Sequence, residues 1–220
     1  MSQVRKEIIE CPHCHQEGEF DLWTSVNVGL DPELREKIFS DELFMYHCPH
    51  CGKVTGIPAG TLYHDMTHDF MIFFDFFKPD DFEYSPMEIP EGFGLQMGYL
   101  FRAVYGLQRF KEKIVILEYG LDDVAIEHQK YMISHVLMPE IAEKGYELFF
   151  AKTEEPDEEF PLGTIYFFYN DEETEQTMEI RFAMDNYYEH KLACELDPRM
   201  KAEGCMCVDA DWMAKQIKEE

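Results

Sequence analysis

Basic residues are scarce in this chain of 220 residues. Its 19 Lys and Arg stand against 45 Asp and Glu, which leaves a formal net charge of −26. Binding to nucleic acid depends on positive charge that displaces counterions from the phosphate backbone. No run of five or more basic residues supplies a local patch of that kind. We therefore expect no nucleic-acid partner.

Long hydrophobic runs are also missing. The most apolar stretch, FMIFFDFF at residues 70–77, is short and is interrupted by Asp75, whereas a membrane helix needs about 20 apolar residues. The first residues, MSQVRKEIIECPHC, lack the apolar core of a signal peptide. We expect no membrane association and a cytoplasmic location.

Cysteine is rare outside two short motifs. Four of the seven cysteines form two Cys-Pro-His-Cys pairs, and the others are Cys194, Cys205 and Cys207. An odd number of cysteines without an export signal does not suggest a disulfide framework. Two residues between cysteines let one tight turn present both sulfurs to a single point, and four such sulfurs are typical of a tetrahedral Zn²⁺ site. The pattern predicts one structural Zn²⁺ per chain, with the ligands Cys11, Cys14, Cys48 and Cys51.

Other functions of the two Cys-Pro-His-Cys motifs, called the knuckles below, are less well supported by the sequence. A thiol–disulfide redox site needs a low-pKa cysteine at the start of a helix, and neither knuckle precedes a clear helical pattern. The histidines around the knuckles are alternative ligands to a sulfur, but with four sulfurs present we expect them to be exposed loop residues. These histidines are His13, His15, His47 and His50.

The segment between the knuckles predicts a zinc-ribbon-like β module with a short helical insertion. Residues 20–28, FDLWTSVNV, alternate as a strand does. Residues 31–38 predict a helix capped by Asp31, with Pro32 at its first position. Residues 42–48 then predict a strand that returns into the second knuckle, where Gly52 suits a left-handed turn.

Several stretches together resemble the bacterial CpXC domain family, which is named for two Cys-Pro-x-Cys turns. They are the repeated CPHC, residues 25–53 (SVNVGLDPELREKIFSDELFMYHCPHCGK), residues 62–74 (LYHDMTHDFMIFF) and residues 112–130 (EKIVILEYGLDDVAIEHQK). The resemblance covers roughly residues 8 to 130. It implies a zinc-type site at Cys11, Cys14, Cys48 and Cys51 and implies no reaction. The chain departs from the family in having His15 after the first turn and a long part at residues 145–220.

The remaining chain predicts further elements of both kinds. A buried strand is expected at residues 69–77, a linker or ordered loop at 78–94, and a strand at 99–106. Residues 121–145 predict a helix with Asp122 as its cap and Gly145 as its stop. Three strands of an antiparallel meander and a terminal helix follow, at residues 146–152, 162–170, 177–185 and 211–220.

These expectations define an α+β protein. Its parts are a zinc-ribbon-like module at 1–78, a linker and helical segment at 79–144 that continues the CpXC domain to about 130, and an antiparallel β/α region at 145–220. No P-loop, nucleophile elbow or dinucleotide-binding motif is present, so we predict no catalytic residues and no organic cofactor. The favoured function is a zinc-stabilised interaction or adaptor module for another protein, whose identity and whose oligomeric state the sequence leaves open.

A metal-dependent or thiol enzyme is the alternative function. In YHDMTHD, His64 and His68 stand four residues apart with Asp65 and Asp69 beside them, and a helix would place both imidazoles on one face. A role at a cap, turn or sheet edge is favoured, because the helical pattern is unclear. The late cysteines, Cys194, Cys205 and Cys207, could form a soft-metal or redox site, but we expect ordinary half-buried cysteines.

Overall fold

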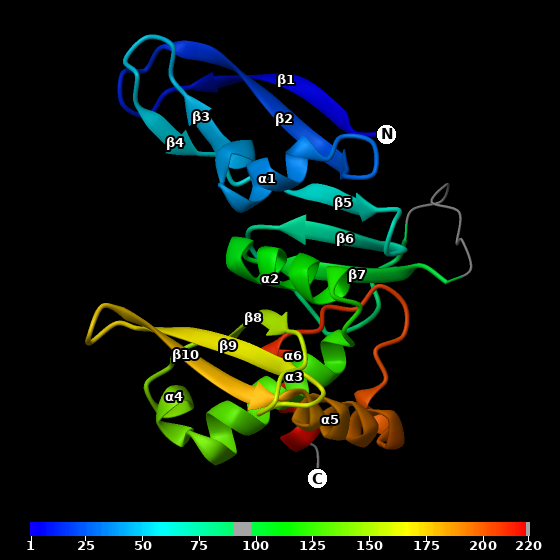
Figure 1. Cartoon of the computed structure of the whole chain (residues 1–220). Coiled ribbons are helices and arrows are strands. Elements are labelled where there is room, and N and C mark those ends of the chain that lie inside the picture. Colours follow the sequence, from blue (N-terminus) through cyan, green and yellow to red (C-terminus); the bar gives the residue numbers. More distant parts are fainter. Residues whose placement is uncertain (90–97, 219–220) are drawn as a thin grey trace. The chain divides into compact units, whose positions relative to one another are not determined.

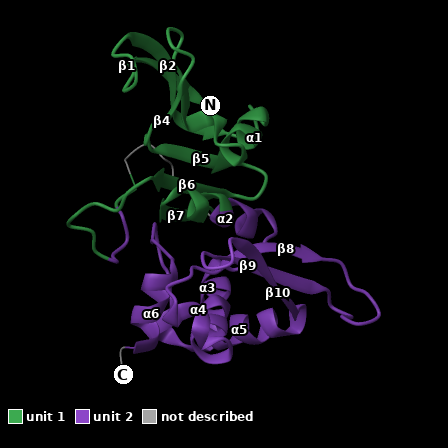
Figure 2. Ribbon diagram, turned by 90° about the vertical axis from the view of Figure 1, so that its left-hand side faces the viewer, with its two compact units in different colours: residues 1–83, 88–111 green, residues 84–87, 112–220 purple. Residues whose placement is uncertain are grey.

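The computed structural model describes residues 1–89 and 98–218, which form two compact units (Figure 2). Unit 1 consists of Met1–Glu83 and Glu88–Lys111, and unit 2 consists of Tyr84–Met87 and Glu112–Glu220. Both units contain strands and helices, so the predicted α+β class is confirmed. The expected domain boundaries at residues 78 and 144 stay a prediction. Part of the expected loop at 78–94 lies outside the described residues.

Unit 1 is built around a five-stranded mixed sheet in the order β1-β2-β5-β6-β7 (Figure 1). The pairs β1–β2 and β5–β6 are antiparallel, and the pairs β2–β5 and β6–β7 are parallel. Strands β3 and β4 form a separate antiparallel pair. The strands are β1 (Gln3–Glu10), β2 (Glu17–Asn27), β3 (Met45–His47), β4 (Val54–Gly56), β5 (Thr61–Asp65), β6 (Phe70–Asp75) and β7 (Leu100–Tyr105).

Alternating burial explains the central strands of this sheet. Phe70, Ile72 and Phe74 of β6 are buried, and their neighbours point to the other face. Helix α2 (Leu107–Glu118) begins in unit 1, where the Phe110 ring stacks on Phe74 with ring centroids 4.2 Å apart. The strands expected at 20–28, 69–77 and 99–106 are confirmed as β2, β6 and β7, and β1, β4 and β5 were not predicted.

The helical insertion between the knuckles differs in detail from the prediction. Helix α1 (Glu33–Phe39) has Pro32 at its N-cap, with no side-chain cap hydrogen bond. The expected cap Asp31 instead accepts a hydrogen bond from the Leu34 N–H through its backbone carbonyl. The strand expected at 42–48 begins only at Met45, because Glu42–Phe44 form a 3₁₀ helix.

Unit 2 contains a three-stranded antiparallel sheet in the order β10-β9-β8, which confirms the expected meander. Its core includes Phe150, Ile165 and Phe167 from the sheet together with Ile126 and Ile133. In the residues that the structure describes, no helix is long and apolar enough to span a membrane. The elements are α3 (Asp123–Met132), α4 (Pro139–Glu143), β8 (Phe149–Glu154), β9 (Thr164–Asp171), β10 (Gln176–Ala183), α5 (Met184–Leu196) and α6 (Ala210–Lys218).

The helix expected at 121–145 is interrupted. Asp122 caps α3 as predicted, because its side chain accepts hydrogen bonds from the N–H groups of Val124 and Ala125. A π-helical segment at Ile133–Leu137 then separates α3 from α4. Gly145 follows α4 with a φ of 74°, a conformation that glycine adopts without steric cost. The helical segment therefore ends where expected, but the π-helical segment interrupts it.

A buried group of charges lies in unit 2. The ammonium of Lys130 on α3 is 2.9 Å from Glu112 Oε1 and 3.0 Å from Glu127 Oε1. Glu112 also accepts a 2.6 Å hydrogen bond from the Phe150 N–H of β8. Burial raises the pKa of Glu127 to about 7, although Lys130 opposes the shift. Each charge is therefore paired, as buried charges must be.

Candidate metal centre

The two knuckles have the same local backbone structure. Residues 11–16 connect β1 to β2, and residues 48–53 connect β3 to β4. The Cys11 N–H donates to the Gln16 carbonyl at 3.0 Å, and the Cys48 N–H donates to the Lys53 carbonyl at 2.9 Å. Each knuckle is thus the closed turn of an antiparallel strand pair.

A left-handed residue ends each turn. The N–H of His15 donates to the Cys11 carbonyl, and the N–H of Gly52 donates to the Cys48 carbonyl, at 2.9 and 3.0 Å. The φ of Gly52 is 70°, as its sequence position predicts, and the φ of His15 is 57°. A residue with a Cβ is strained in this region. The first turn therefore carries strain that the second avoids.

The two turns bring four sulfur atoms together. All four Sγ atoms lie within 4.8 Å of one another. The distance is 3.7 Å between Cys11 and Cys51, and again 3.7 Å between Cys14 and Cys48, so each short distance joins one knuckle to the other. Over residues 1–89 and 98–218, this is the one group of three or more Cys, His, Asp and Glu side chains placed to hold a metal ion.

Local electrostatics give Cys48 and Cys14 different pKa values. Burial acts to raise the pKa of Cys48, but the N–H groups of Cys51 and His50 and the neighbouring thiols outweigh it and lower that pKa to about 6. The Gln16 N–H acts to lower the pKa of Cys14, yet burial and the other three thiols raise it to about 12. Cys48 is therefore the sulfur that the protein prepares as a thiolate.

Aromatic side chains pack beneath the sulfurs. Cys11, Cys48, Phe20 and Tyr46 form one buried cluster, and the Phe20 and Tyr46 rings meet edge to face with centroids 6.4 Å apart. Burial first, and then the Cys48 thiol, raise the pKa of the Tyr46 phenol. No feature of the sequence singled out Tyr46. Its position two residues before Cys48, on a strand that ends in the knuckle, is the signal that could have found it.

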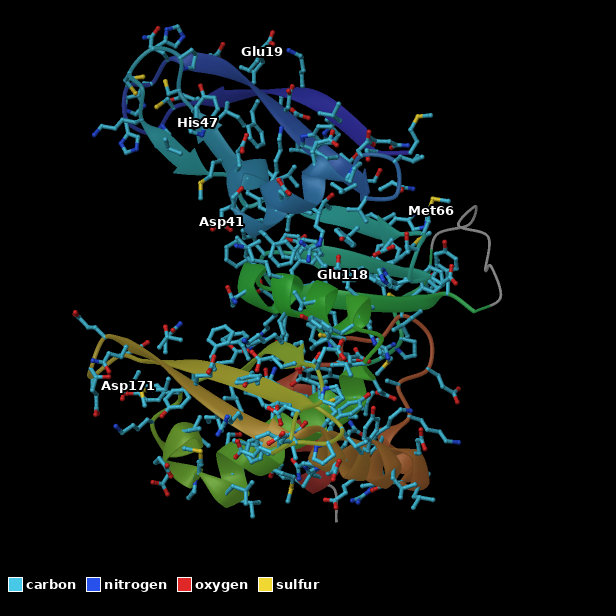
Figure 3. The ribbon with its side chains drawn as sticks, viewed as in Figure 1. Glu19, Asp41, His47, Met66, Glu118 and Asp171 are labelled. Carbon is cyan, nitrogen blue, oxygen red and sulfur yellow. The ribbon has the colours of Figure 1, made fainter. Side chains whose placement is uncertain are left out.

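The nearby histidines lie outside the sulfur group. His13, His15, His47 and His50 are all exposed, as predicted, and Figure 3 shows His47 on β3. His15 Nδ1 is 2.9 Å from Glu10 Oε1, and His50 Nε2 is 2.9 Å from the Glu17 carbonyl. The donor set is therefore made of sulfur alone.

The second histidine motif is not helical. His64 lies on β5, whereas His68 lies in the turn that leads to β6. Asp65 is buried and accepts from the N–H groups of Thr67 and His68, and its other oxygen is 2.7 Å from His68 Nδ1. Asp65 and His68 thus belong to a turn, as favoured, whereas His64 lies on the central strand of the sheet and not at its edge. A cavity of about 670 Å³ in unit 1 is lined by His64 but not by Asp65 or His68.

The late cysteines are fully buried in unit 2 and not half-buried. Cys194 lies on α5, and burial raises the pKa of its thiol to about 12. Cys207 donates a hydrogen bond to Asp209 Oδ2 at 3.4 Å. Burial makes all three thiols poorly accessible, and the raised pKa of Cys194 makes that thiol a poor nucleophile as well.

Two sulfur-bearing hairpins with closed turns define a protein with a four-cysteine cluster that is positioned to hold a metal ion. Comparison with protein families matches residues 9–130 to the CpXC protein family, and the match includes all four cysteines. The chain belongs to the CpXC family. No curated protein and no solved structure matches it.

Proposed function

We propose that the chain binds one structural Zn²⁺ through Cys11, Cys14, Cys48 and Cys51. The two 3.7 Å sulfur–sulfur distances carry this proposal. A tetrahedron with zinc–sulfur bonds of about 2.3 Å has sulfur–sulfur edges of about 3.8 Å. Two of the six sulfur–sulfur distances therefore match this edge, and the other four are no longer than 4.8 Å.

The same geometry favours a structural role over a catalytic one. Four thiolates complete the coordination of Zn²⁺ and leave no position for water or substrate. Each knuckle closes an antiparallel strand pair, which is the arrangement of a zinc ribbon. The metal would fasten the β1–β2 hairpin to the β3–β4 hairpin and couple its binding energy to folding.

We further propose that the zinc-stabilised protein acts as an interaction or adaptor module for another protein in the cytoplasm. Helix α5 supports this, because Tyr188, Leu192 and Leu196 recur at intervals of four residues and are 50%, 56% and 76% exposed. Three acidic residues lie on the same helix, namely Asp185, Glu189 and Glu195. The whole chain has a formal net charge of −26. A basic protein segment with an apolar face would complement this surface, and nucleic acid would be repelled.

Metal analysis of the full-length protein from its own host tests the zinc site. We expect one zinc per chain, and we expect Cys48→Ser to lose most of it because a serine hydroxyl is a poor ligand for zinc. Cys194→Ser is the matched control. Cys194 is buried, belongs to unit 2 and is distant from the knuckles in sequence. This variant should keep the metal.

Three results would contradict the proposal. Two or more tightly bound metals per chain would mean a second site. Iron in place of zinc would show that the native metal is not zinc. Retention of the metal by Cys48→Ser would show that Cys48 is not a ligand.

A further inference from the structure

A buried hydroxyl beneath the knuckles has no hydrogen-bond partner. Tyr46 is 1% exposed, and within the described residues its phenol oxygen makes no hydrogen bond. Buried polar groups in folded proteins are nearly always satisfied, because losing water without gaining a partner costs free energy. The orphaned hydroxyl therefore points to an acceptor that becomes available in the loaded protein.

The surroundings of Tyr46 restrict where that acceptor can be. Tyr46 is on β3, two residues before Cys48, and packs in the cluster that contains Cys11 and Cys48. On the opposite hairpin Gly18 leaves room for the hydroxyl, because a Cβ at this position would lie 2.2 Å from the phenol oxygen. The oxygen is thus enclosed between the two hairpins that carry the sulfurs.

Metal binding changes the chemistry of the neighbouring sulfurs. A neutral thiol is a weak hydrogen-bond acceptor, whereas metal ligation requires the thiolate. Hydrogen bonds to charged acceptors are about twice as strong as those between neutral groups. Metal ligation holds the Cys48 sulfur as a thiolate, so the bound metal keeps a strong acceptor on the sulfur two residues from Tyr46.

We propose that the Tyr46 hydroxyl donates a hydrogen bond to the metal-bound Cys48 thiolate and acts as a positioning residue for the metal centre. This inference rests on the proposed metal site and goes beyond it by assigning a fifth residue. Such outer partners fix the orientation of a ligand and draw electron density from it, and their loss typically lowers metal affinity about 10- to 100-fold.

The test compares Tyr46→Phe with the wild type, using Co²⁺ as a spectroscopic probe and chelator competition to measure zinc affinity. Removal of the donor should raise the energy of the Cys48 lone pairs. We therefore expect the sulfur-to-cobalt charge-transfer bands to move to lower energy and zinc affinity to fall about 10-fold or more. Tyr63→Phe is the matched control, because Tyr63 is equally buried in unit 1 but outside the sulfur cluster. It should change neither quantity.

A second measurement needs no variant. In wild-type protein loaded with a magnetic cadmium isotope, the Tyr46 hydroxyl proton should exchange slowly and show a scalar coupling to the metal through the sulfur. This keeps the inference testable if Tyr46→Phe fails to fold.

The outcomes separate the two proposals. A four-sulfur cobalt spectrum and zinc affinity that Tyr46→Phe leaves unchanged would overturn the hydrogen bond and leave the zinc site intact. Absence of metal binding by the wild-type protein would overturn both.

Discussion

Two glycines at the metal centre serve different physical purposes. Gly52 has a φ of 70°, and an added Cβ there would meet nothing within 4 Å, so glycine is favoured by the backbone conformation alone, which His15 adopts with strain in the first knuckle. Gly18 lies in the regular strand β2, where any residue could adopt the backbone conformation. Its Cβ would instead collide with Tyr46, and would lie 3.0 Å from Pro49 of the second knuckle. Gly18 is required by the close approach of the two hairpins.

Gly18→Ala should therefore destabilise the metal-loaded protein. Forcing a methyl group into a filled site typically costs about 1–3 kcal/mol, which a denaturant titration followed by circular dichroism can measure. Gly56→Ala is the control, because an added Cβ there meets nothing within 4 Å, and it should cause no loss.

The double variant Gly18→Ala/Tyr46→Phe identifies the cause of the Gly18 effect. Removing the hydroxyl removes the closest contact of the new methyl group, so the double variant should lose less free energy than the sum of the two single variants. Additive losses would show that Tyr46 is not what excludes a side chain at residue 18.

The sequence predicts the four sulfurs but not the residues that surround them. Cys-Pro-His-Cys determines a local turn, so the spacing alone indicates that the sulfurs converge. The pairing of Gly18 with Tyr46 depends on how β1–β2 lies against β3–β4, and residues 18 and 46 share no local pattern. The sequence therefore did not predict the contacts of the site that join elements distant in sequence.

Among the elements, helix α5 was missed for a physical reason. Its exposed face carries Tyr188, Leu192 and Leu196, so the apolar residues do not form the single stripe that identifies an amphipathic helix. The meander, in contrast, was recognisable from its acidic turns and its strands rich in aromatic and β-branched residues. Strand β1 escaped prediction because most of its side chains are exposed.

Helix α5 is attached to α3 by polar contacts that are sensitive to acid. His128 Nδ1 lies 2.9 Å from His190 Nδ1, so one ring donates and the other accepts. Beside them the Gln129 amide donates to Asn186 at 2.7 Å. Burial lowers the pKa of both histidines, Asp197 partly opposes this at His128, and the neighbouring His128 helps to lower the pKa of His190 to about 4.

We expect the His128–His190 pair to contribute a loss of stability to unit 2 as the pH falls from about 6.5 toward 4, measured as the difference from a variant that lacks the pair. In that window the unfolded chain binds protons that the folded His128–His190 pair resists, so protonation favours unfolding. One unit of pKa difference corresponds to about 1.4 kcal/mol, and because both rings are only partly buried we expect a loss on the order of 1 kcal/mol. Denaturant titrations at pH 7 and pH 5 measure it.

The comparison with His190→Gln isolates this effect. Glutamine preserves a hydrogen-bonding side chain but cannot be protonated, so the variant should lose less stability than the wild type over the same interval. The comparison is needed because Glu127, with a folded-state pKa of about 7, has the opposite effect: the folded state takes up its proton first, and stability rises as the pH falls. Equal losses in both proteins would exclude the histidine pair as the cause.

At the scale of the whole molecule, each unit has a core of its own. The sulfur cluster of Cys11, Phe20, Tyr46 and Cys48 lies in unit 1. The core around Phe150, Ile165 and Phe167 lies in unit 2 and includes no metal-binding cysteine. We therefore expect the stability of unit 2 not to depend directly on a metal bound at the knuckles.

Removal of the metal with a chelator should consequently loosen one part of the chain and spare another. The knuckles are 33 residues apart in sequence, and without a metal the free energy that holds them together is lost. We expect amide hydrogen exchange to become faster over residues 8 to 60, whereas β8, β9 and β10 keep their protection because their hydrogen bonds and apolar core remain. Re-addition of Zn²⁺ to the chelated sample is the control and should restore slow exchange. Faster exchange throughout both units would show that the metal stabilises the whole chain, and unchanged exchange at residues 8 to 60 would show that it is not structural.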